Sequence, residues 1–193
     1  MLSSEESLKI LKETNALLEG HFILSSGLHS SQYVQCAQLM SKPDKAHNLC
    51  VSLSEKIKKE LEQFDLILSP AMGGIIIGYE IAKLLNKETI FCERVNGEFK
   101  LRRDFLIKKN QKILIVEDVI TTGKSTIECS KLAEKMEAKI IGYACLIDRS
   151  NGKSLLNKKI VSQVKLNIPT YSEDKLPEKL LAIKAVKPGS RNL

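Results

Sequence analysis

The sequence predicts one α/β domain, residues 1–193, whose central and mainly parallel sheet is flanked by helices. Short aliphatic runs such as residues 66–68 and 113–116 alternate with longer segments of helical periodicity. Apolar runs of this length between turn residues are typical of strands buried on both faces. The repeated order of strand, turn and helix favours parallel strands joined by right-handed crossovers. The chain has 193 residues, 43% of them hydrophobic, which is enough for one substantial core.

Composition narrows the class of protein. The formal net charge of +7 favours anionic partners, but aromatic residues make up only 5% of the chain and tryptophan is absent. We therefore expect a small phosphorylated substrate and no nucleic acid. The five cysteines form no CxxC pair, which indicates reduced, buried thiols in a cytoplasmic protein. We expect no membrane partner, because no apolar run has the length of a transmembrane helix.

The first element is expected to be a helix. Ser3 and Glu6 have the spacing of a capping box, and Gly20 is a natural helix stop. Two short strands, residues 21–24 and 32–36, should follow, joined by a polar turn. The turn is dense in small polar residues for a plain surface hairpin: Ser25, Ser26, Gly27, His29, Ser30 and Ser31.

Two helices and a strand are expected next. Pro43 suits the first turn of a helix, and apolar residues then recur every fourth position to about Glu62. The strand at residues 66–68 leads through a tight turn, residues 70–74, to an apolar helix at residues 75–85. The two glycines of that turn either let a ligand approach the backbone or supply a positive φ.

A basic segment, residues 94–105, follows the strand expected at residues 88–93. Asn96-Gly97 is a strong hairpin signal, and the segment lacks a clear core periodicity. It is either an exposed basic hairpin or a flap that closes over a ligand. We call this segment the flap.

The most informative stretch is residues 112–125. The strand at residues 113–116 ends in Glu117 and Asp118, and a turn rich in threonine and glycine then opens a helix. Amides at a helix N-terminus bind phosphate, whereas a carboxylate pair holds hydroxyl groups or, through them, Mg²⁺. A ribose 5-phosphate has both a phosphate for the helix N-terminus and hydroxyl groups for the carboxylate pair. An ordinary capped helix leaves the acidic pair unexplained, and a nucleoside-triphosphate loop would need glycine at position 118.

The remaining elements complete the alternation. A helix after Ser125 precedes a strand at residues 138–147, and Arg149 follows that strand directly. Its guanidinium suits a bidentate contact with a carboxylate, the alternative being a surface ion pair with Asp148. An edge strand at residues 161–168 and a helix at residues 172–183 should follow, then a tail at residues 184–191.

Three segments resemble a known family. EDVITTGKS, residues 117–125, resembles the phosphoribosyl-diphosphate (PRPP) motif of type I phosphoribosyltransferases. GHFILSSGLHSSQYVQC, residues 20–36, resembles the N-terminal signature of orotate phosphoribosyltransferases, and ERVNG with LRR in the flap resembles one branch of them. The resemblance implies a type I phosphoribosyltransferase fold with a small hood subdomain, built from about residues 1–40 and 160–193.

The resemblance also implies a reaction. Ribose 5-phosphate would pass from PRPP to N1 of orotate, giving orotidine 5′-monophosphate and pyrophosphate in pyrimidine synthesis. Mg²⁺ would be carried by PRPP near Glu117 and Asp118, with no direct protein ligand. A homodimer with a shared active site is expected.

Roles for single residues follow from the same resemblance. PRPP would bind at Ala71, Met72, Gly73, Gly74, Glu117, Asp118, Val119, Ile120, Thr121, Thr122, Gly123, Lys124 and Ser125. Orotate would bind at Ser26, Gly27, Thr121 and Arg149. The catalytic residues would be Arg94, Lys100, Arg102, Arg103 and Asp118. Many members carry lysine where this chain has Ser25 and Gly73, so the identity of the catalytic cation stays open.

Two other functions are compatible with parts of the sequence. A purine phosphoribosyltransferase would keep residues 117–125 but should lack the segment at residues 20–36. A PRPP-sensing regulator that binds nucleic acid would account for the basic surplus without catalysis.

Overall fold

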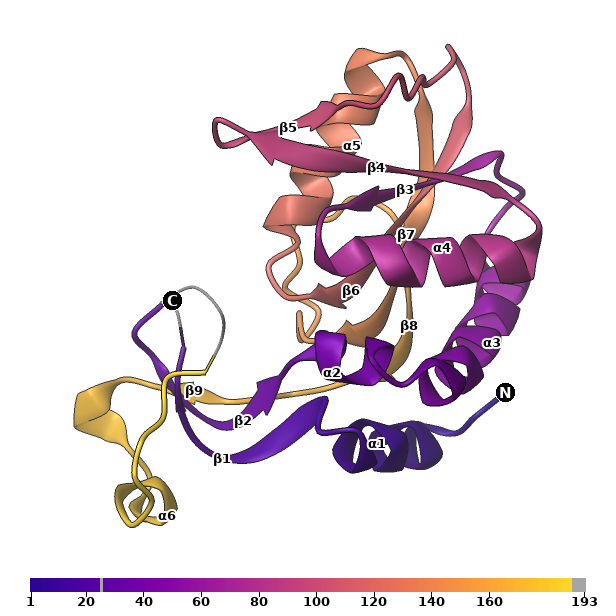
Figure 1. The fold of residues 1–193 in the computed structure, drawn as a ribbon. Helices are drawn as coiled ribbons and strands as arrows, with labels where there is room; N and C mark the ends of the chain where they lie inside the picture. Colours follow the sequence, from indigo (N-terminus) through magenta and orange to yellow (C-terminus); the bar gives the residue numbers. More distant parts are fainter. Residues whose placement is uncertain (25, 189–193) are drawn as a thin grey trace.

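The computed structural model describes residues 1–24 and 26–188, which form two sheets (Figure 1). The large sheet has six strands in the order β5-β4-β3-β6-β7-β8, and all its neighbours are parallel except the β4–β5 hairpin. Its strands are β3 (Leu66–Pro70), β4 (Glu88–Val95), β5 (Glu98–Leu101), β6 (Lys112–Ile120), β7 (Lys139–Asp148) and β8 (Ile160–Lys165).

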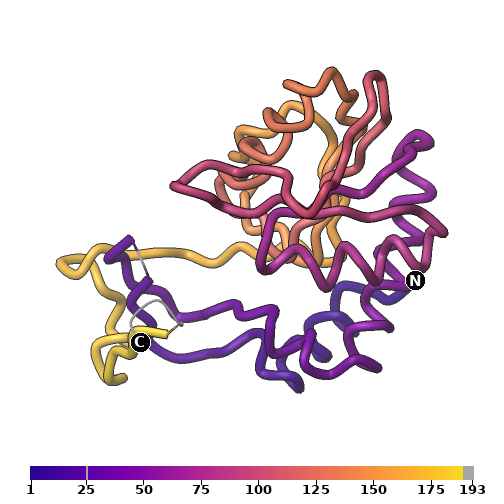
Figure 2. The backbone as a smooth tube through the Cα atoms, turned by 45° about the horizontal axis from the view of Figure 1, so that its top comes forward, coloured from indigo at the N-terminus to yellow at the C-terminus, as the bar shows by residue number. Residues whose placement is uncertain are grey.

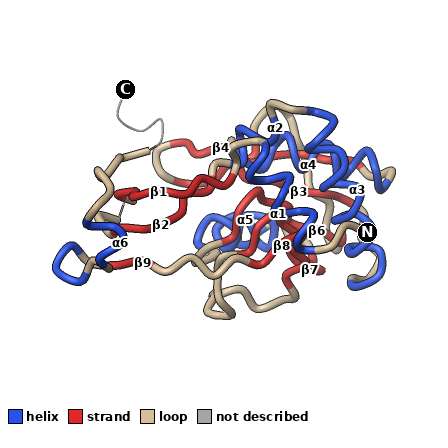
Figure 3. The backbone as a smooth tube through the Cα atoms, turned by 90° about the horizontal axis from the view of Figure 1, so that it is seen from below, coloured by secondary structure: helices blue, strands red, loops and turns tan. Residues whose placement is uncertain are grey.

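The small sheet is antiparallel and lies to one side of the large one (Figure 3). It consists of β1 (Leu17–Ile23), β2 (His29–Val34) and β9 (Thr170–Tyr171). After β8 the C-terminal segment leaves the large sheet and extends to the small sheet (Figure 2). Val186 then pairs with β1: its N–H donates to the carbonyl of His21, and its carbonyl accepts from the N–H of Ile23, both at 2.9 Å.

Helices cover both faces of the large sheet. They are α1 (Ser4–Glu13), α3 (Pro43–Glu60), α4 (Gly73–Leu85) and α5 (Lys124–Lys135), and α2 (Cys36–Met40) packs on α3 and α4. The C-terminal segment carries α6 (Glu178–Leu181) and a 3-10 turn at Glu173–Lys175, which lie beside the small sheet (Figure 1). Alternate side chains of β6 point to opposite faces, as the pleat requires. Leu114 and Val116 pack in the core that contains α3 and α4, whereas Ile113 and Ile115 pack with α5.

The parallel strands bring three loops to one edge of the sheet. β3, β6 and β7 all end there, with Leu68 in register with Ile115 and Ile120 with Asp148. Ligands of open α/β sheets bind beyond this carboxyl edge. The sheet prediction is confirmed, and so is the capping box, in which Ser3 and Glu6 each bond the other's backbone N–H.

Several predicted boundaries are wrong, among them the edge strand expected at residues 161–168, which ends at Lys165. The first helix ends at Glu13, not near Gly20, because Asn15 has φ 57° and turns the chain into β1. The second strand is His29–Val34, and Cys36 begins a short helix. The helix expected at residues 172–183 is divided at Pro177, which lacks an N–H and stands just before α6.

Two expectations concern residues outside the described part of the chain: the departure at Ser25 and the end of the tail, residues 189–191. In the described residues, no helix combines the length and hydrophobicity needed to cross a membrane.

Candidate active site

The turn between β6 and α5 presents backbone amides to solvent. Gly123 has φ 80° and caps α5, and its carbonyl accepts a 2.8 Å bond from the N–H of Ile127. The N-cap residue Gly123 provides no side-chain cap, and Oγ1 of Thr122 accepts a long, 3.3 Å bond from the N–H of Lys124. Thr121, Thr122, Lys124 and Ser125 are exposed. A helix start of this kind attracts an anion through its free N–H groups and its dipole.

Glu117 and Asp118 lie at the carboxyl end of β6, where burial raises the pKa of both groups. Burial, followed by the charge of Asp118, raises the pKa of Glu117 from 4.5 to about 9. Burial likewise raises the pKa of Asp118, whose Oδ1 accepts a 2.7 Å bond from the N–H of Val119. In the structure as described, Oε2 of Glu117 is buried without a partner. Native proteins seldom leave a buried polar atom unpaired, so this oxygen indicates a ligand group.

The turn after β3 lies directly against the carboxylate pair. A Cβ atom added at Gly73 would stand 2.8 Å from Oδ2 of Asp118, and one added at Gly74 would stand 2.9 Å from the carbonyl oxygen of Val116. Neither glycine has positive φ, so the interpretation as a turn requiring positive φ is wrong. The reason for the glycines is close approach, of the Asp118 carboxylate at Gly73 and of the β6 backbone at Gly74. Ala71 precedes them, and Met72 is 82% exposed.

Arg149 begins the loop after β7 and is half-buried. Its N–H donates to the carbonyl of Ile120 at 2.8 Å, which holds it beside the β6 turn and Thr121. Burial lowers the pKa of its guanidinium, an effect that Tyr33 opposes. Its Nε is buried and unpaired in the described chain. The predicted alternative, an ion pair with Asp148, is wrong, because Asp148 accepts from the N–H of Ser150 at 2.8 Å.

The β1–β2 hairpin supplies two aromatic residues that the sequence analysis did not single out. Phe22 and Tyr33 have ring centres 5.7 Å apart, and Tyr33 lies within electrostatic range of Arg149. Each of them lies in one of the two strand-like runs of residues 20–36, which was the available signal. Ser26 and Gly27 are exposed at the tip of this hairpin and make no hydrogen bond to Thr121 or Arg149.

The flap is an ordered hairpin. Asn96 and Gly97 have φ of 53° and 85°, as a tight hairpin turn requires, and Phe99 packs in the core. The hairpin predicted from Asn96-Gly97 is confirmed, and Phe99 faces the core although the segment has no clear core periodicity. Its cations pair within the chain: Arg94 with Glu128, and Arg103 with Glu93 at 2.9 Å. Arg102 lies 4.0 Å from Glu93, and Lys100 is exposed.

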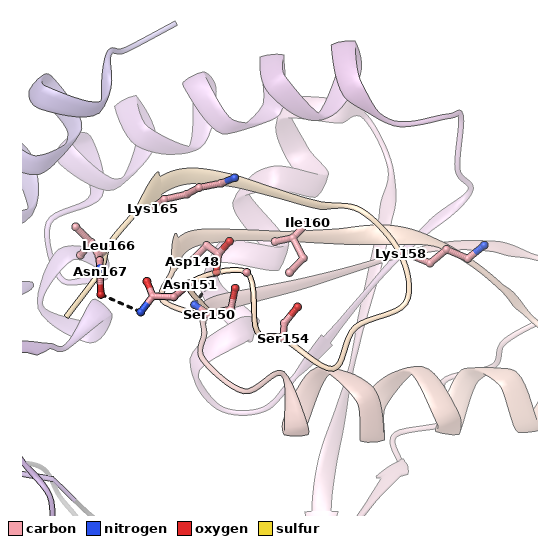
Figure 4. Close-up of a pocket in the computed structure, with 10 residues that line it drawn as sticks. Asp148, Ser150, Asn151, Ser154, Lys158, Ile160, Lys165, Leu166 and Asn167 are labelled. Atoms are coloured by element: carbon pink, nitrogen blue, oxygen red, sulfur yellow. Dashed lines mark hydrogen bonds between the residues drawn. The ribbon is translucent and has the colours of Figure 1, made fainter. Parts of the chain in front are cut away.

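The loop between β7 and β8 packs against the turn between β6 and α5. The N–H of Leu155 donates to the carbonyl of Thr122 at 3.3 Å, and Leu156 fills the space that a Cβ at Gly123 would occupy, 3.0 Å away. A cavity of about 460 Å³ lies between this loop and β8 (Figure 4). It is lined by Asp148, Ser150, Asn151, Lys165 and Asn167 among others, and none of the predicted PRPP-binding residues lines it.

The residues suit a metal ion only as part of a ligand. Among the described residues, no three His, Cys, Asp or Glu side chains converge on one point. Mg²⁺ commonly binds through one or two carboxylates together with substrate phosphates. Glu117, with its unpaired oxygen, and Asp118 fit that arrangement.

The fold and site define the class of protein, and sequence comparison agrees. Residues 44–174 match the family model described as "Phosphoribosyl transferase domain". The chain is 46% identical to an orotate phosphoribosyltransferase of Parvibaculum lavamentivorans and 43% identical to one of Maricaulis maris, over the full length of each. The protein belongs to the orotate phosphoribosyltransferase family.

A solved structure shows the same fold. The crystal structure of orotate phosphoribosyltransferase from Aeropyrum pernix is similar with a TM-score of 0.68 and 24% identity. The similarity covers 82% of this chain and 92% of that one.

Proposed function

We propose that this enzyme transfers ribose 5-phosphate from PRPP to N1 of orotate, a glycosyl transfer in pyrimidine biosynthesis. The products are orotidine 5′-monophosphate and pyrophosphate. The observation that carries the proposal is the buried, partly unpaired acidic pair between a glycine turn and an uncapped helix start. This arrangement fits a sugar diol with an anionic group on either side.

Each end of PRPP has a counterpart in the chain. The 5′-phosphate fits the amides at the start of α5, with Thr121–Ser125 around it. The ribose hydroxyls donate to Glu117 and Asp118. The diphosphate fits the turn at residues 71–74, where the glycines leave the backbone accessible. Mg²⁺ bound with PRPP would neutralise charge on the diphosphate as it leaves.

Orotate needs orientation more than activation. It enters as an anion, so a strong general base is unnecessary, and positioning accounts for much of the rate. Arg149 has an unpaired guanidinium nitrogen and lies near Tyr33. We propose that it binds the carboxylate of orotate. We propose that the small sheet with the C-terminal segment is the hood over the base.

The flap supplies cations and excludes water. PRPP would be hydrolysed in an open site, so closure over the diphosphate protects the donor. Arg94, Lys100, Arg102 and Arg103 are the cations available on this hairpin, and we rank Arg94 first. The flap would move from the in-chain contacts described above.

We propose a cytoplasmic homodimer with no nucleic-acid or membrane partner. One face of α4 and the turn before it exposes Met72, Ile76 and Tyr79 at 82%, 57% and 63%. Spaced three and four residues apart, these side chains form an apolar stripe typical of a surface that is covered by a partner. The stripe begins in the diphosphate-binding turn, so a second copy there would stand at the active site.

The purified protein with orotate, PRPP and Mg²⁺ tests the function through the loss of orotate absorbance. We expect turnover with orotate and none with adenine or guanine. Turnover of a purine base alone would favour the purine-type alternative.

Asp118→Asn tests the position of the ribose. Loss of one carboxylate removes a charged acceptor for the diol, which is worth about 1.5–3 kcal/mol. We expect the Kd for PRPP, measured by calorimetry, to rise about tenfold or more. Asp174→Asn, at an exposed position in the C-terminal segment, is the matched control. Unchanged PRPP affinity in Asp118→Asn would contradict the placement.

A further inference from the structure

Arg94 makes three contacts within its own chain. Its guanidinium donates to the carboxylate of Glu128 and, at 2.7 Å, to the carbonyl oxygen of Gly97. Its Cζ atom lies 4.2 Å from the centre of the Phe99 ring. Phe99 belongs to the core that also contains residues of α5, so the flap is docked on that helix. Figure 1 shows the β4–β5 hairpin beside α5.

Glu128 lies on the helix whose N-terminus forms the phosphate-binding turn. It stands four residues after Lys124, the first residue of α5. At 1.5 Å per residue, the distance along the helix is about 6 Å, little more than one turn. Arg94 is therefore held close to the proposed site, but by a carboxylate of its own chain.

A diphosphate and a carboxylate compete for the same group. Both accept paired N–H bonds from one guanidinium, and Arg94 cannot give the same N–H groups to both. We infer that Glu128 is a positioning residue: it holds Arg94 in a resting place on α5, and the diphosphate of PRPP must displace it to recruit Arg94. The inference rests on the proposed function and adds a residue to which neither the sequence motifs nor the family resemblance assigns a role.

The contact sets the apparent affinity for PRPP. Both side chains are partly exposed, at 40% and 31%, so the ion pair is weak and easily exchanged. A contact of this kind lowers the fraction of protein ready to bind, and the apparent Kd rises by the same factor. Removing the carboxylate should lower the Kd for PRPP about two- to fivefold.

Glu128→Gln tests the inference because glutamine keeps the size of the side chain and loses its charge. We expect the KM and the calorimetric Kd for PRPP to fall about two- to fivefold, with the KM for orotate unchanged. In an Arg94→Ala background, Glu128→Gln should change neither value. Glu134→Gln is the control, since Glu134 is exposed on the same helix and forms no ion pair in the described structure.

Other outcomes distinguish failure of the role inferred for Glu128 from failure of the proposed function. An unchanged or higher Kd for PRPP in Glu128→Gln would overturn the positioning role, as would an equal decrease in the Arg94→Ala background. A wild-type protein that binds PRPP but does not consume orotate would overturn the proposed function instead. The binding measurements would still report on the contact between Glu128 and Arg94.

Discussion

At the scale of single residues, the acidic pair shows how burial of a carboxylate opposes stability. Glu117 is 9% exposed and has an unpaired oxygen, and it directly follows four fully buried residues of β6, Ile113–Val116. Its position after an aliphatic run could be recognised in the sequence. Its burial and its missing partner depend on tertiary packing, in which the turn at residues 71–74 from another strand lies against its neighbours Val116 and Asp118.

Glu117→Gln should stabilise the protein without ligand at high pH. The folded protein keeps a proton on Glu117 up to about pH 9, whereas the unfolded chain releases it above about pH 4.5. The free energy of unfolding therefore decreases as pH rises through this window. We expect the substitution to raise Tm by at least about 2 °C near pH 8 and to change it little near pH 5.

Thermal unfolding at both pH values measures this difference. Glu134→Gln, at an exposed position, controls for the loss of one charge. An equal shift of Tm at both pH values would show that Glu117 is ionised in the folded protein.

At the scale of elements, strong local periodicity was sufficient to predict a helix or strand. Pairing between segments distant in the sequence could not be predicted. β3, β6 and α4 follow from aliphatic runs and turn residues that occur within a few positions. The first helix and the divided C-terminal helix were mispredicted, because Asn15 and Pro177 acted against an apolar pattern that continued past them. Contacts between distant segments leave no such local pattern.

The buried pair of His21 and His29 is one such contact. Nε2 of His21 lies 2.6 Å from Nδ1 of His29, and Nδ1 of His21 lies 2.9 Å from the carbonyl oxygen of Ile183. A carbonyl only accepts, so we assign the His21 proton to Nδ1, and His29 then donates to Nε2. The pair joins the β1–β2 hairpin to the C-terminal segment.

His21→Ala should loosen the C-terminal segment. Losing buried hydrogen bonds costs about 1–3 kcal/mol, so we expect amide hydrogen exchange in residues 170–188 to accelerate about tenfold. His47→Ala is the matched control, since His47 pairs with Glu80 between α3 and α4, outside the small sheet. Equal exchange in this segment for both variants would mean that backbone pairing alone holds it.

At the scale of the whole molecule, the active site is assembled from separate parts of the chain. The turn at residues 71–74, the β6 turn and Arg149 meet because parallel strands end at one edge of the sheet. This convergence follows from the predicted topology. The ion pairs of the flap cations could not be predicted, because no sequence pattern marks Glu93 or Glu128 as their partner.

Mixed dimers test whether the flap acts on the site of a second copy. Arg94→Ala and Asp118→Asn subunits, mixed after separate purification, would then place one intact site in each mixed dimer. Random exchange should restore about a quarter of wild-type activity. The double variant Arg94→Ala with Asp118→Asn should stay inactive, and Ile76→Glu in both subunits should prevent recovery by charging the α4 stripe.

Val186 pairs with β1 from a position more than 160 residues later in the chain. During synthesis, every strand of the large sheet is therefore made before the partner that completes the outlying one. On the proposed assignment, a nascent chain therefore completes the sheet that would bind PRPP before the hood that would cover the base.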